Sequence, residues 1–141
     1  MSEPVTAGIP ATGPAGQPIV RCAIANSGEP WKLNIDALVL SVGSGLGGLA
    51  EAVRAEFPEA AWSAVYQADI SPDRPYTLNL DTTDQVTSLR VAIVATPHEG
   101  SKHGPASVGA ARIATGYAIR SAMHAGVVAL GLPLLGAGID H

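Results

Sequence analysis

The sequence predicts an α/β fold, because continuous apolar runs alternate with segments of helical spacing. The runs Ala37 to Val42 and Arg90 to Thr96 show no period-two alternation, which is typical of strands buried on both faces. Apolar residues at helical spacing follow each run along the chain. We therefore expect both strands in one sheet, with helices packed against it.

A glycine-rich loop follows the first buried strand and opens the first helix. It spans Gly43 to Gly48 and contains four glycines, which let the backbone approach a ligand where side chains would block it. The helix after it ends at Pro58. Because a helix start directs free N–H groups and the positive end of the helix dipole at one point, we expect this loop to bind a phosphate.

Composition and charge limit the classes of function. The chain of 141 residues has room for one domain, and 47% hydrophobic residues are typical of a globular protein. A net charge of −4, with few and scattered Lys and Arg residues, predicts neither a nucleic-acid partner nor a membrane partner. The sequence shows no secretory signal and no membrane-spanning run, so we expect a cytoplasmic protein.

Metal binding and side-chain catalysis find little support in the sequence. Cys22 is the only cysteine and lies in an apolar segment, where an inert buried thiol is expected. The four histidines are His98, His103, His124 and His141. Their spacing from Cys22 matches no metal-binding motif. We predict no metal site, no cofactor and no catalytic residue, and we interpret the loop histidines as exposed side chains.

The remaining elements follow from turn residues and apolar spacing. Residues 1–17 are rich in Pro, Gly, Ala and Thr, which predicts a flexible leader before a domain spanning residues 18–141. A helix is expected to begin near Pro105, to pack closely on the sheet at Gly116 and to stop at Gly126. One face of this helix is expected to consist of Ala110, Ile113, Ala114, Tyr117, Ala118, Ser121 and Ala122. Further strands are expected at Pro18 to Ala25, Trp62 to Tyr66, Tyr76 to Leu80, Val86 to Leu89 and Val127 to Leu135.

The last of these strands also ends in glycine. The segment Gly136 to Asp140 follows it, and it is expected at the same edge of the sheet as the first glycine loop. Two glycine-rich loops at one edge predict a clamp around a ligand.

The order and spacing of these motifs resemble a macro domain. The motifs that carry the resemblance are Asp36 to Val42, the first glycine loop, the strand ending in Ala95-Thr96-Pro97, the helix with Tyr117, and Ala129 to Ile139. The resemblance extends from about Ile19 to the last residue. It implies a three-layer α/β/α fold around a mixed sheet, with ADP-ribose or a related NAD-derived nucleotide held between two loops.

The resemblance also implies which residues contact the ligand. In the first loop the diphosphate would lie along Gly45, Gly47, Gly48 and Leu49, and the second loop would consist of Gly136, Ala137, Gly138 and Ile139. Glu29 stands in a Gly-Glu pair where the family has Gly-Asp, which makes it the candidate for the adenine contact. Asp140 would position a ribose hydroxyl or cap a turn.

One departure from the family concerns catalysis. Hydrolytic macro domains carry Asn-Ala-Ala-Asn after the buried strand, whereas this chain has Ser41-Val42-Gly43-Ser44. A hydroxyl at Ser44 donates one hydrogen bond to a ligand and does not reproduce the two-ended contact of an amide. The resemblance therefore predicts a binding module, with Ser44 among its ligand contacts, rather than an ADP-ribosyl hydrolase.

A second departure concerns the end of the sequence. The family continues after its second loop with a helix and a strand, whereas this sequence stops at His141. An absent strand would leave a gap in the sheet. We expect an N-terminal sensing module of a larger signalling or effector protein, with a downstream domain in the same polypeptide.

Two other classes of function stay open. The spacing Gly43-x-Gly45-x-x-Gly48 also fits the dinucleotide fingerprint and resembles the start of FAD-dependent enzymes of the amine-oxidase type. An FAD- or NAD-binding Rossmann domain of an oxidoreductase is therefore one alternative. A scaffold or oligomerisation domain without a ligand is the second.

Overall fold

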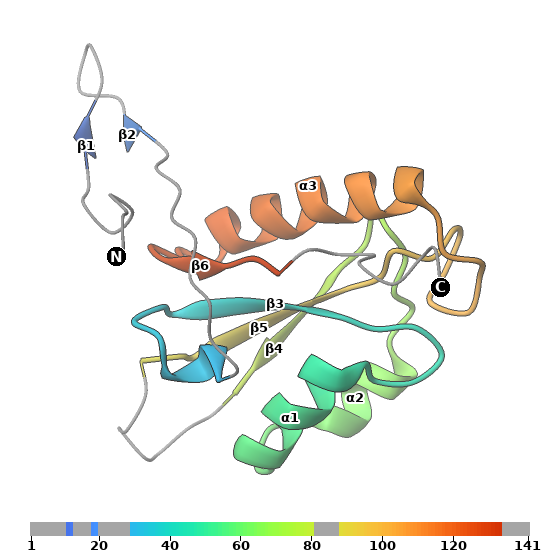
Figure 1. Cartoon of the computed structure of the whole chain (residues 1–141), viewed down its shortest axis with the longest axis horizontal. Coiled ribbons are helices and arrows are strands. Elements are labelled where there is room, and N and C mark those ends of the chain that lie inside the picture. Colours follow the sequence, from blue (N-terminus) through green and yellow to red (C-terminus); the bar gives the residue numbers. More distant parts are fainter. Residues whose placement is uncertain (1–10, 13–17, 20–28, 81–87, 134–141) are drawn as a thin grey trace.

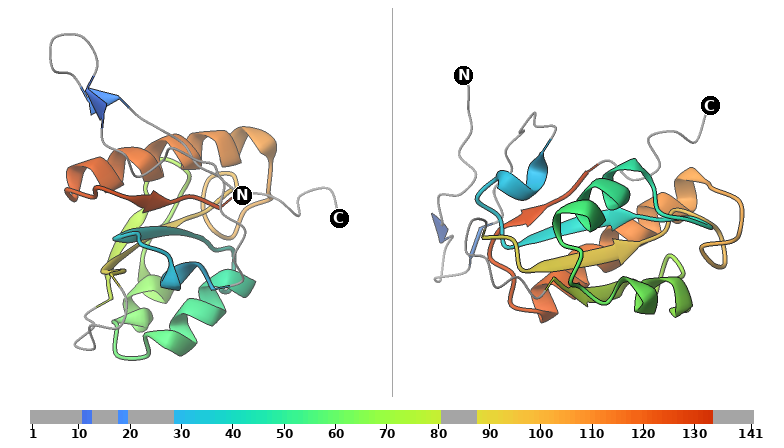
Figure 2. Two further views of the ribbon diagram at one scale, coloured as in Figure 1. Left: turned by 60° about the vertical axis from the view of Figure 1, so that its left-hand side comes forward. Right: turned by 90° about the horizontal axis from the view of Figure 1, so that it is seen from below.

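The computed structural model describes residues 11–12, 18–19, 29–80 and 88–133. Within these ranges the elements are β1 (Ala11–Thr12), β2 (Pro18–Ile19), the 3-10 helix η2 (Pro30–Lys32), β3 (Ala37–Ser41), α1 (Gly48–Glu56), α2 (Trp62–Gln67), β4 (Tyr76–Asn79), β5 (Val91–Ala95), α3 (Val108–His124) and β6 (Leu130–Gly131). Figures 1 and 2 show three layers, with α3 on one face of the main sheet and α1 and α2 on the other. The predicted α/β fold with a three-layer arrangement is confirmed.

The main sheet is mixed, with the strand order β4-β5-β3-β6. The central pair, β3 and β5, runs parallel in a register that joins Ala37 to Val91 and Ser41 to Ala95. Strand β6 is also parallel to β3, whereas β4 is antiparallel to β5. The carboxyl ends of the three parallel strands therefore lie at the same end of the sheet, and the glycine loop follows β3 at that end.

Side chains of β3 and β5 alternate between two cores. One core contains Leu38, Leu40, Val42, Ala92 and Val94, and it packs against α1, α2 and Trp31 of η2. The other contains Val39, Ile93 and Ala95, and it packs against α3. Because both faces are covered, every position along these strands except the last residue of β3, Ser41, is apolar, which explains the continuous runs in the sequence.

The prediction of a strand at Trp62 to Tyr66 is wrong, because this segment lies in helix α2. Trp62 and Val65, three positions apart, are buried together, whereas Tyr66 is exposed. The indole N–H of Trp62 donates a hydrogen bond of 2.8 Å to the carbonyl oxygen of Phe57, just after α1. A short apolar run is ambiguous between a helix and a strand, and burial at helical spacing decides here.

Helix α3 packs on the sheet through small side chains. Its buried residues are Ala110, Ala111, Ala114, Ala118 and Ala122. The helix face predicted from the sequence is confirmed for its four alanines and is wrong for Ile113 and Tyr117, which are 49% and 36% exposed. Gly116 is also exposed, and a Cβ there would meet nothing within 4 Å, so the expected close packing at this glycine is wrong too.

Turn residues bound α3 at both ends, and the helix begins at Val108 rather than near Pro105 as expected from the sequence. Ser107 is the N-cap, and its side chain accepts a hydrogen bond of 3.0 Å from the N–H of Ala110. Gly126 follows the C-cap Ala125 and has a φ of +76°, the left-handed conformation that favours glycine. The predicted stop at Gly126 is confirmed.

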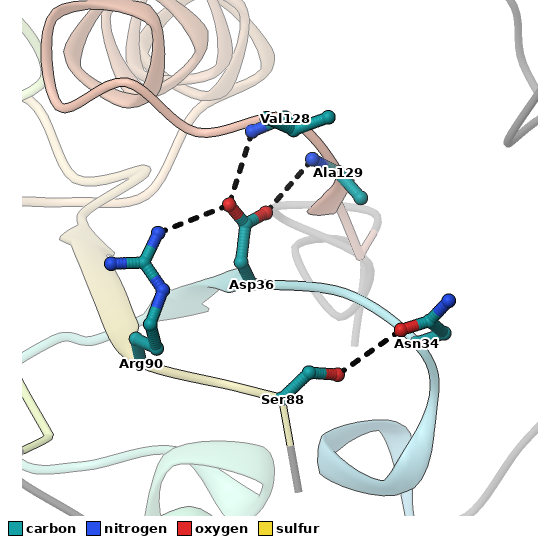
Figure 3. Close-up of polar contacts among 6 residues, drawn as sticks. All are labelled: Asn34, Asp36, Ser88, Arg90, Val128 and Ala129. Carbon is teal, nitrogen blue, oxygen red and sulfur yellow. Dashed lines mark hydrogen bonds and ion pairs between the residues drawn. The ribbon is translucent and has the colours of Figure 1, made fainter. Parts of the chain in front are cut away.

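A polar network joins three strands at the opposite end of the sheet (Figure 3). The carboxylate of Asp36, immediately before β3, accepts hydrogen bonds from the backbone N–H groups of Val128 (3.1 Å) and Ala129 (2.8 Å). It also accepts one from the guanidinium of Arg90, immediately before β5, at 3.2 Å. One side chain thus joins β3 to its neighbours on both sides, a role that is not predicted from the sequence.

Several other predicted strands are shorter than expected or lie outside the described residues. Tyr76 to Leu80 is confirmed as β4, with its last strand residue at Asn79. The described part of Val86 to Leu89, residues 88–89, is not a strand. Within the predicted strand Val127 to Leu135, the strand in the described residues is the shorter β6. Within the predicted strand Pro18 to Ala25, the described residues form β2, which pairs antiparallel with β1.

Candidate functional site

The glycine loop is held at its two ends by the backbone. The N–H of Val42 donates to the carbonyl oxygen of Ala95 (2.9 Å), which extends the β3–β5 pairing by one residue. Val42 and Leu46 form an isolated bridge, and the N–H of Gly43 donates to the carbonyl oxygen of Gly45 (3.0 Å). The loop is therefore a defined turn between β3 and α1.

The glycines of this loop differ in what the fold demands of them. A Cβ at Gly43 would lie 2.9 Å from a ring nitrogen of His98, and one at Gly47 would lie 3.2 Å from the carbonyl oxygen of Ser41. At Gly45 and Gly48 a Cβ would meet nothing within 4 Å. A side chain at position 43 would therefore have to displace the ring of His98, whereas positions 45 and 48 are open.

Helix α1 begins without a side-chain cap. Gly47 is its N-cap and has no side chain that could accept from the first N–H groups of the helix, while Ser107 supplies such a cap at α3. The carbonyl of Gly47 accepts from the N–H of Glu51 at 2.9 Å. Gly47 and Gly48 are exposed to solvent, so the start of α1 is accessible to an anion.

His98 borders the glycine loop, although the sequence analysis assigned it to exposed loop residues. It is half-buried, and its Nδ1 lies 2.6 Å from the carbonyl oxygen of Gly104. Its backbone N–H donates to the hydroxyl of Thr96 (3.3 Å). The ring edge with Nε2 faces Gly43, because a Cβ there would lie nearest to that nitrogen. The prediction of an exposed side chain is wrong for His98.

The segment between β5 and α3 also makes hydrogen bonds to helix α2. Lys102 is buried, and its ammonium group donates to the carbonyl oxygens of Val65 (2.9 Å) and Tyr66 (2.8 Å) in α2. A Cβ at Gly104 would lie against the carbonyl oxygen of Glu99, so the turn requires glycine there. These contacts fix the position of the segment that carries His98.

The structure describes six of the residues predicted to contact a ligand. Ser44, Gly45, Gly47 and Gly48 are exposed and Leu49 is half-buried, all in the loop or the first turn of α1. Glu29 forms an ion pair of 3.2 Å with Lys32, and Figure 1 shows the adjoining η2 near the amino-terminal end of β3. The predicted second loop, Gly136, Ala137, Gly138, Ile139 and Asp140, lies outside the described residues.

Two features that the described residues lack concern metals and membranes. No group of three His, Cys, Asp or Glu residues in that part of the chain is placed to hold a metal ion. His103 and His124 are exposed there. None of the described helices is both long enough and apolar enough to cross a membrane.

Comparisons with known proteins place this fold. No protein-family model and no curated protein matches the sequence. The structure is similar to the macrodomain of Mycobacterium tuberculosis DarG, with a TM-score of 0.65 and 18% sequence identity over 81% of this chain and 76% of that chain. It is also similar to Thermosipho africanus DarTG, solved in complex with ADP-ribose, with a TM-score of 0.55 and 18% identity over 75% of this chain and 31% of that chain. The chain has the macrodomain fold that its motif order predicts.

Proposed function

We propose that this chain is a binding module for ADP-ribose or a closely related nucleotide, whose diphosphate lies on the glycine loop between β3 and α1. The fold supports the proposal, since one structure similar to it was solved with ADP-ribose. The position of the loop supports it as well. In open α/β sheets, ligands bind beyond the carboxyl ends of the strands, and this loop lies there.

One observation carries the proposal: the glycines at positions 45 and 48 are not required by the described fold. Neither has a backbone conformation that excludes a side chain, and neither would place a Cβ against another atom. Gly48 is in the first turn of α1, where glycine costs helix stability relative to alanine. Room for an external molecule explains why side chains are absent at both positions.

The remaining contacts are proposed by family resemblance. Strand β6 runs parallel to β3, so its carboxyl end points toward the edge that carries the glycine loop. The segment Gly136 to Asp140 follows β6 in the sequence and would complete the clamp. Glu29 is proposed for the adenine end of the nucleotide.

We propose binding without hydrolysis, because Ser44 replaces the amide that hydrolytic relatives use. Its hydroxyl is exposed and can donate a single hydrogen bond to the ligand. The module would sense the nucleotide on behalf of a larger cytoplasmic signalling protein, with the response produced by a downstream domain.

The topology disfavours the dinucleotide-binding alternative. In a Rossmann unit, the helix after the glycine loop leads into a second parallel strand beside the first. Here α1 leads into α2 and then into β4, which is antiparallel and lies at the edge of the sheet. The parallel neighbours of β3 are β5 and β6.

Calorimetric titration with ADP-ribose, AMP, NAD and FAD tests the proposal. ADP-ribose is expected to bind with micromolar affinity, and Gly45→Leu is expected to weaken it at least about tenfold, because the added side chain fills the diphosphate position. Gly116→Leu is the matched control, since position 116 is equally open but lies on α3. Cooperative thermal unfolding of both variants confirms that they fold.

Three outcomes would contradict the proposal. Preferential binding of FAD would indicate the oxidoreductase alternative. An ADP-ribose affinity that is equal in wild-type and Gly45→Leu protein would place the ligand elsewhere. Absence of binding by all four nucleotides would indicate a scaffold.

A further inference from the structure

We propose that His98 donates a hydrogen bond from Nε2 to the diphosphate of the bound nucleotide, so that ligand binding takes up a proton. The proposal rests on the function proposed above for the glycine loop. It adds a side-chain contact that the sequence analysis did not assign. Its basis is the geometry of the imidazole ring between the β5–α3 segment and the loop.

The first nitrogen of the ring is committed to the protein. A carbonyl oxygen can only accept a hydrogen bond, so the contact of 2.6 Å between Nδ1 and the oxygen of Gly104 requires a proton on Nδ1. In the neutral ring, Nε2 then carries a lone pair, which would repel the oxygen of an anion. In the imidazolium, Nε2 carries a proton and becomes a charge-assisted donor.

The second nitrogen is presented to the loop. Nε2 lies 2.9 Å from the place where a side chain at Gly43 would begin, so the glycine leaves space for the ring. Among the described residues, no group forms a hydrogen bond with Nε2. An anion on the loop would therefore supply the partner that the described protein does not.

None of the charged side chains described around His98 pairs with its ring, so the proposed partner of Nε2 is the ligand. On its own segment, Glu99 and His103 are exposed, and the ammonium group of Lys102 donates to carbonyl oxygens of α2. On α1, Glu51 is paired with an arginine of the same helix. The first turn of α3 has no acidic residue. Within the described chain, no carboxylate forms an ion pair with His98.

Calorimetry at several pH values tests the proposal. Because Nε2 donates only in the imidazolium form, the affinity for ADP-ribose should rise several-fold when the pH is lowered from 8 to 6. At a fixed pH, titrations in two buffers of different ionisation enthalpy should reveal proton uptake. ADP-ribose is a better probe than AMP, because a terminal phosphate monoester itself titrates near about pH 6.

Two substitutions of His98 distinguish the roles of its two ring nitrogens. His98→Asn places an amide N–H near the Nδ1 position and keeps the contact with Gly104, but it removes the contact with the ligand. His98→Gln reaches the Nε2 position and retains an uncharged donor. Both variants should lose the proton uptake, and His98→Asn should bind several-fold more weakly than His98→Gln at pH 6. His103→Gln is the matched control and should keep the pH dependence of the wild type.

The outcomes distinguish this proposal from the one it rests on. ADP-ribose binding that is independent of pH, or proton uptake that persists in His98→Asn, would overturn the role of His98 and leave the binding module intact. Loss of the pH dependence in His103→Gln would transfer the role to that residue. Absence of ADP-ribose binding at every pH would overturn both proposals.

Discussion

The two ends of the main sheet satisfy their polar groups in opposite ways. At the amino-terminal end of β3, the carboxylate of Asp36 is surrounded by donors of the chain itself, Val128, Ala129 and Arg90. At the carboxyl end, an exposed glycine loop opens α1 without a side-chain cap. The first arrangement is complete within the protein and contributes stability. The second leaves donors for a molecule from outside.

The same contrast appears between two helices that start at one edge. Helix α3 begins with Ser107, whose hydroxyl accepts from the N–H of Ala110. Helix α1 begins with Gly47 and Gly48, which offer no such acceptor. Because every helix start has free N–H groups, the lack of an internal cap at α1 favours ligand binding there over α3.

Removal of the Asp36 carboxylate should have the largest effect on stability. Asp36→Ala removes the acceptor of the N–H groups of Val128 and Ala129, and water can replace it only at the exposed Val128 contact, so we expect a loss of about 2 kcal/mol of unfolding free energy in urea. Asp69→Ala is the control, because its ion pair with Arg74 is exposed and contributes little. The ADP-ribose affinity of the folded Asp36→Ala protein should be unchanged. A changed affinity would show that the two ends are coupled.

The same carboxylate should make stability depend on pH. Burial raises the pKa of Asp36, but the hydrogen bonds from Ala129, Val128 and Arg90 outweigh it, so the pKa lies below its ordinary value. Such a group stabilises the folded state above its unfolded pKa of about 4, and the contribution is lost as pH falls through the folded pKa. Urea midpoints of wild-type protein should therefore fall more steeply below about pH 4 than those of Asp36→Asn. Parallel curves would contradict this assignment.

Loss of the α3 cap should have a moderate effect that is confined to stability. Ser107→Ala removes the acceptor for the N–H of Ala110, which should cost about 1 kcal/mol. Thermal and urea unfolding measure the loss, and calorimetry with ADP-ribose should show no change. Ser107→Asp restores an acceptor and should recover the stability. A variant that weakens ligand binding would show that α3 also contributes to the site.

The smallest effect should come from the exposed glycine within α3. Gly116→Ala replaces the residue with a better helix former where the new Cβ meets nothing within 4 Å, so we expect a gain of at most about 1 kcal/mol in unfolding free energy. Nucleotide binding should stay the same. A loss of stability would show that the glycine at position 116 is needed by a contact outside the described residues.

Local patterns were sufficient to predict the elements that surround the candidate site. The apolar runs of β3 and β5, the position of the glycine loop between β3 and α1, and the stop at Gly126 are all confirmed, because each depends on residues adjacent in the sequence. The segment Trp62 to Tyr66 failed because its length fits either a strand or a helix turn. Its buried pair, Trp62 and Val65, at a spacing of three was the available signal.

The contacts between distant segments could not be read from such patterns. His98 meets Gly43 because β5 pairs in parallel with β3, and that register is a property of the folded sheet. Asp36 likewise meets residues more than 90 positions away through the position of β6. On α3, the spacing allowed both Ile113 and its alanine neighbours to be buried, and close approach to the sheet selected the alanines.

Nuclear magnetic resonance of the ¹⁵N-labelled protein during titration with ADP-ribose tests the central claim most directly. The account predicts that the largest amide shifts occur in the glycine loop and the first turn of α1, at Gly45, Gly48 and Leu49, while Val128 and Ala129 keep their positions. Largest shifts at Val128 and Ala129, with an unchanged glycine loop, would contradict the account.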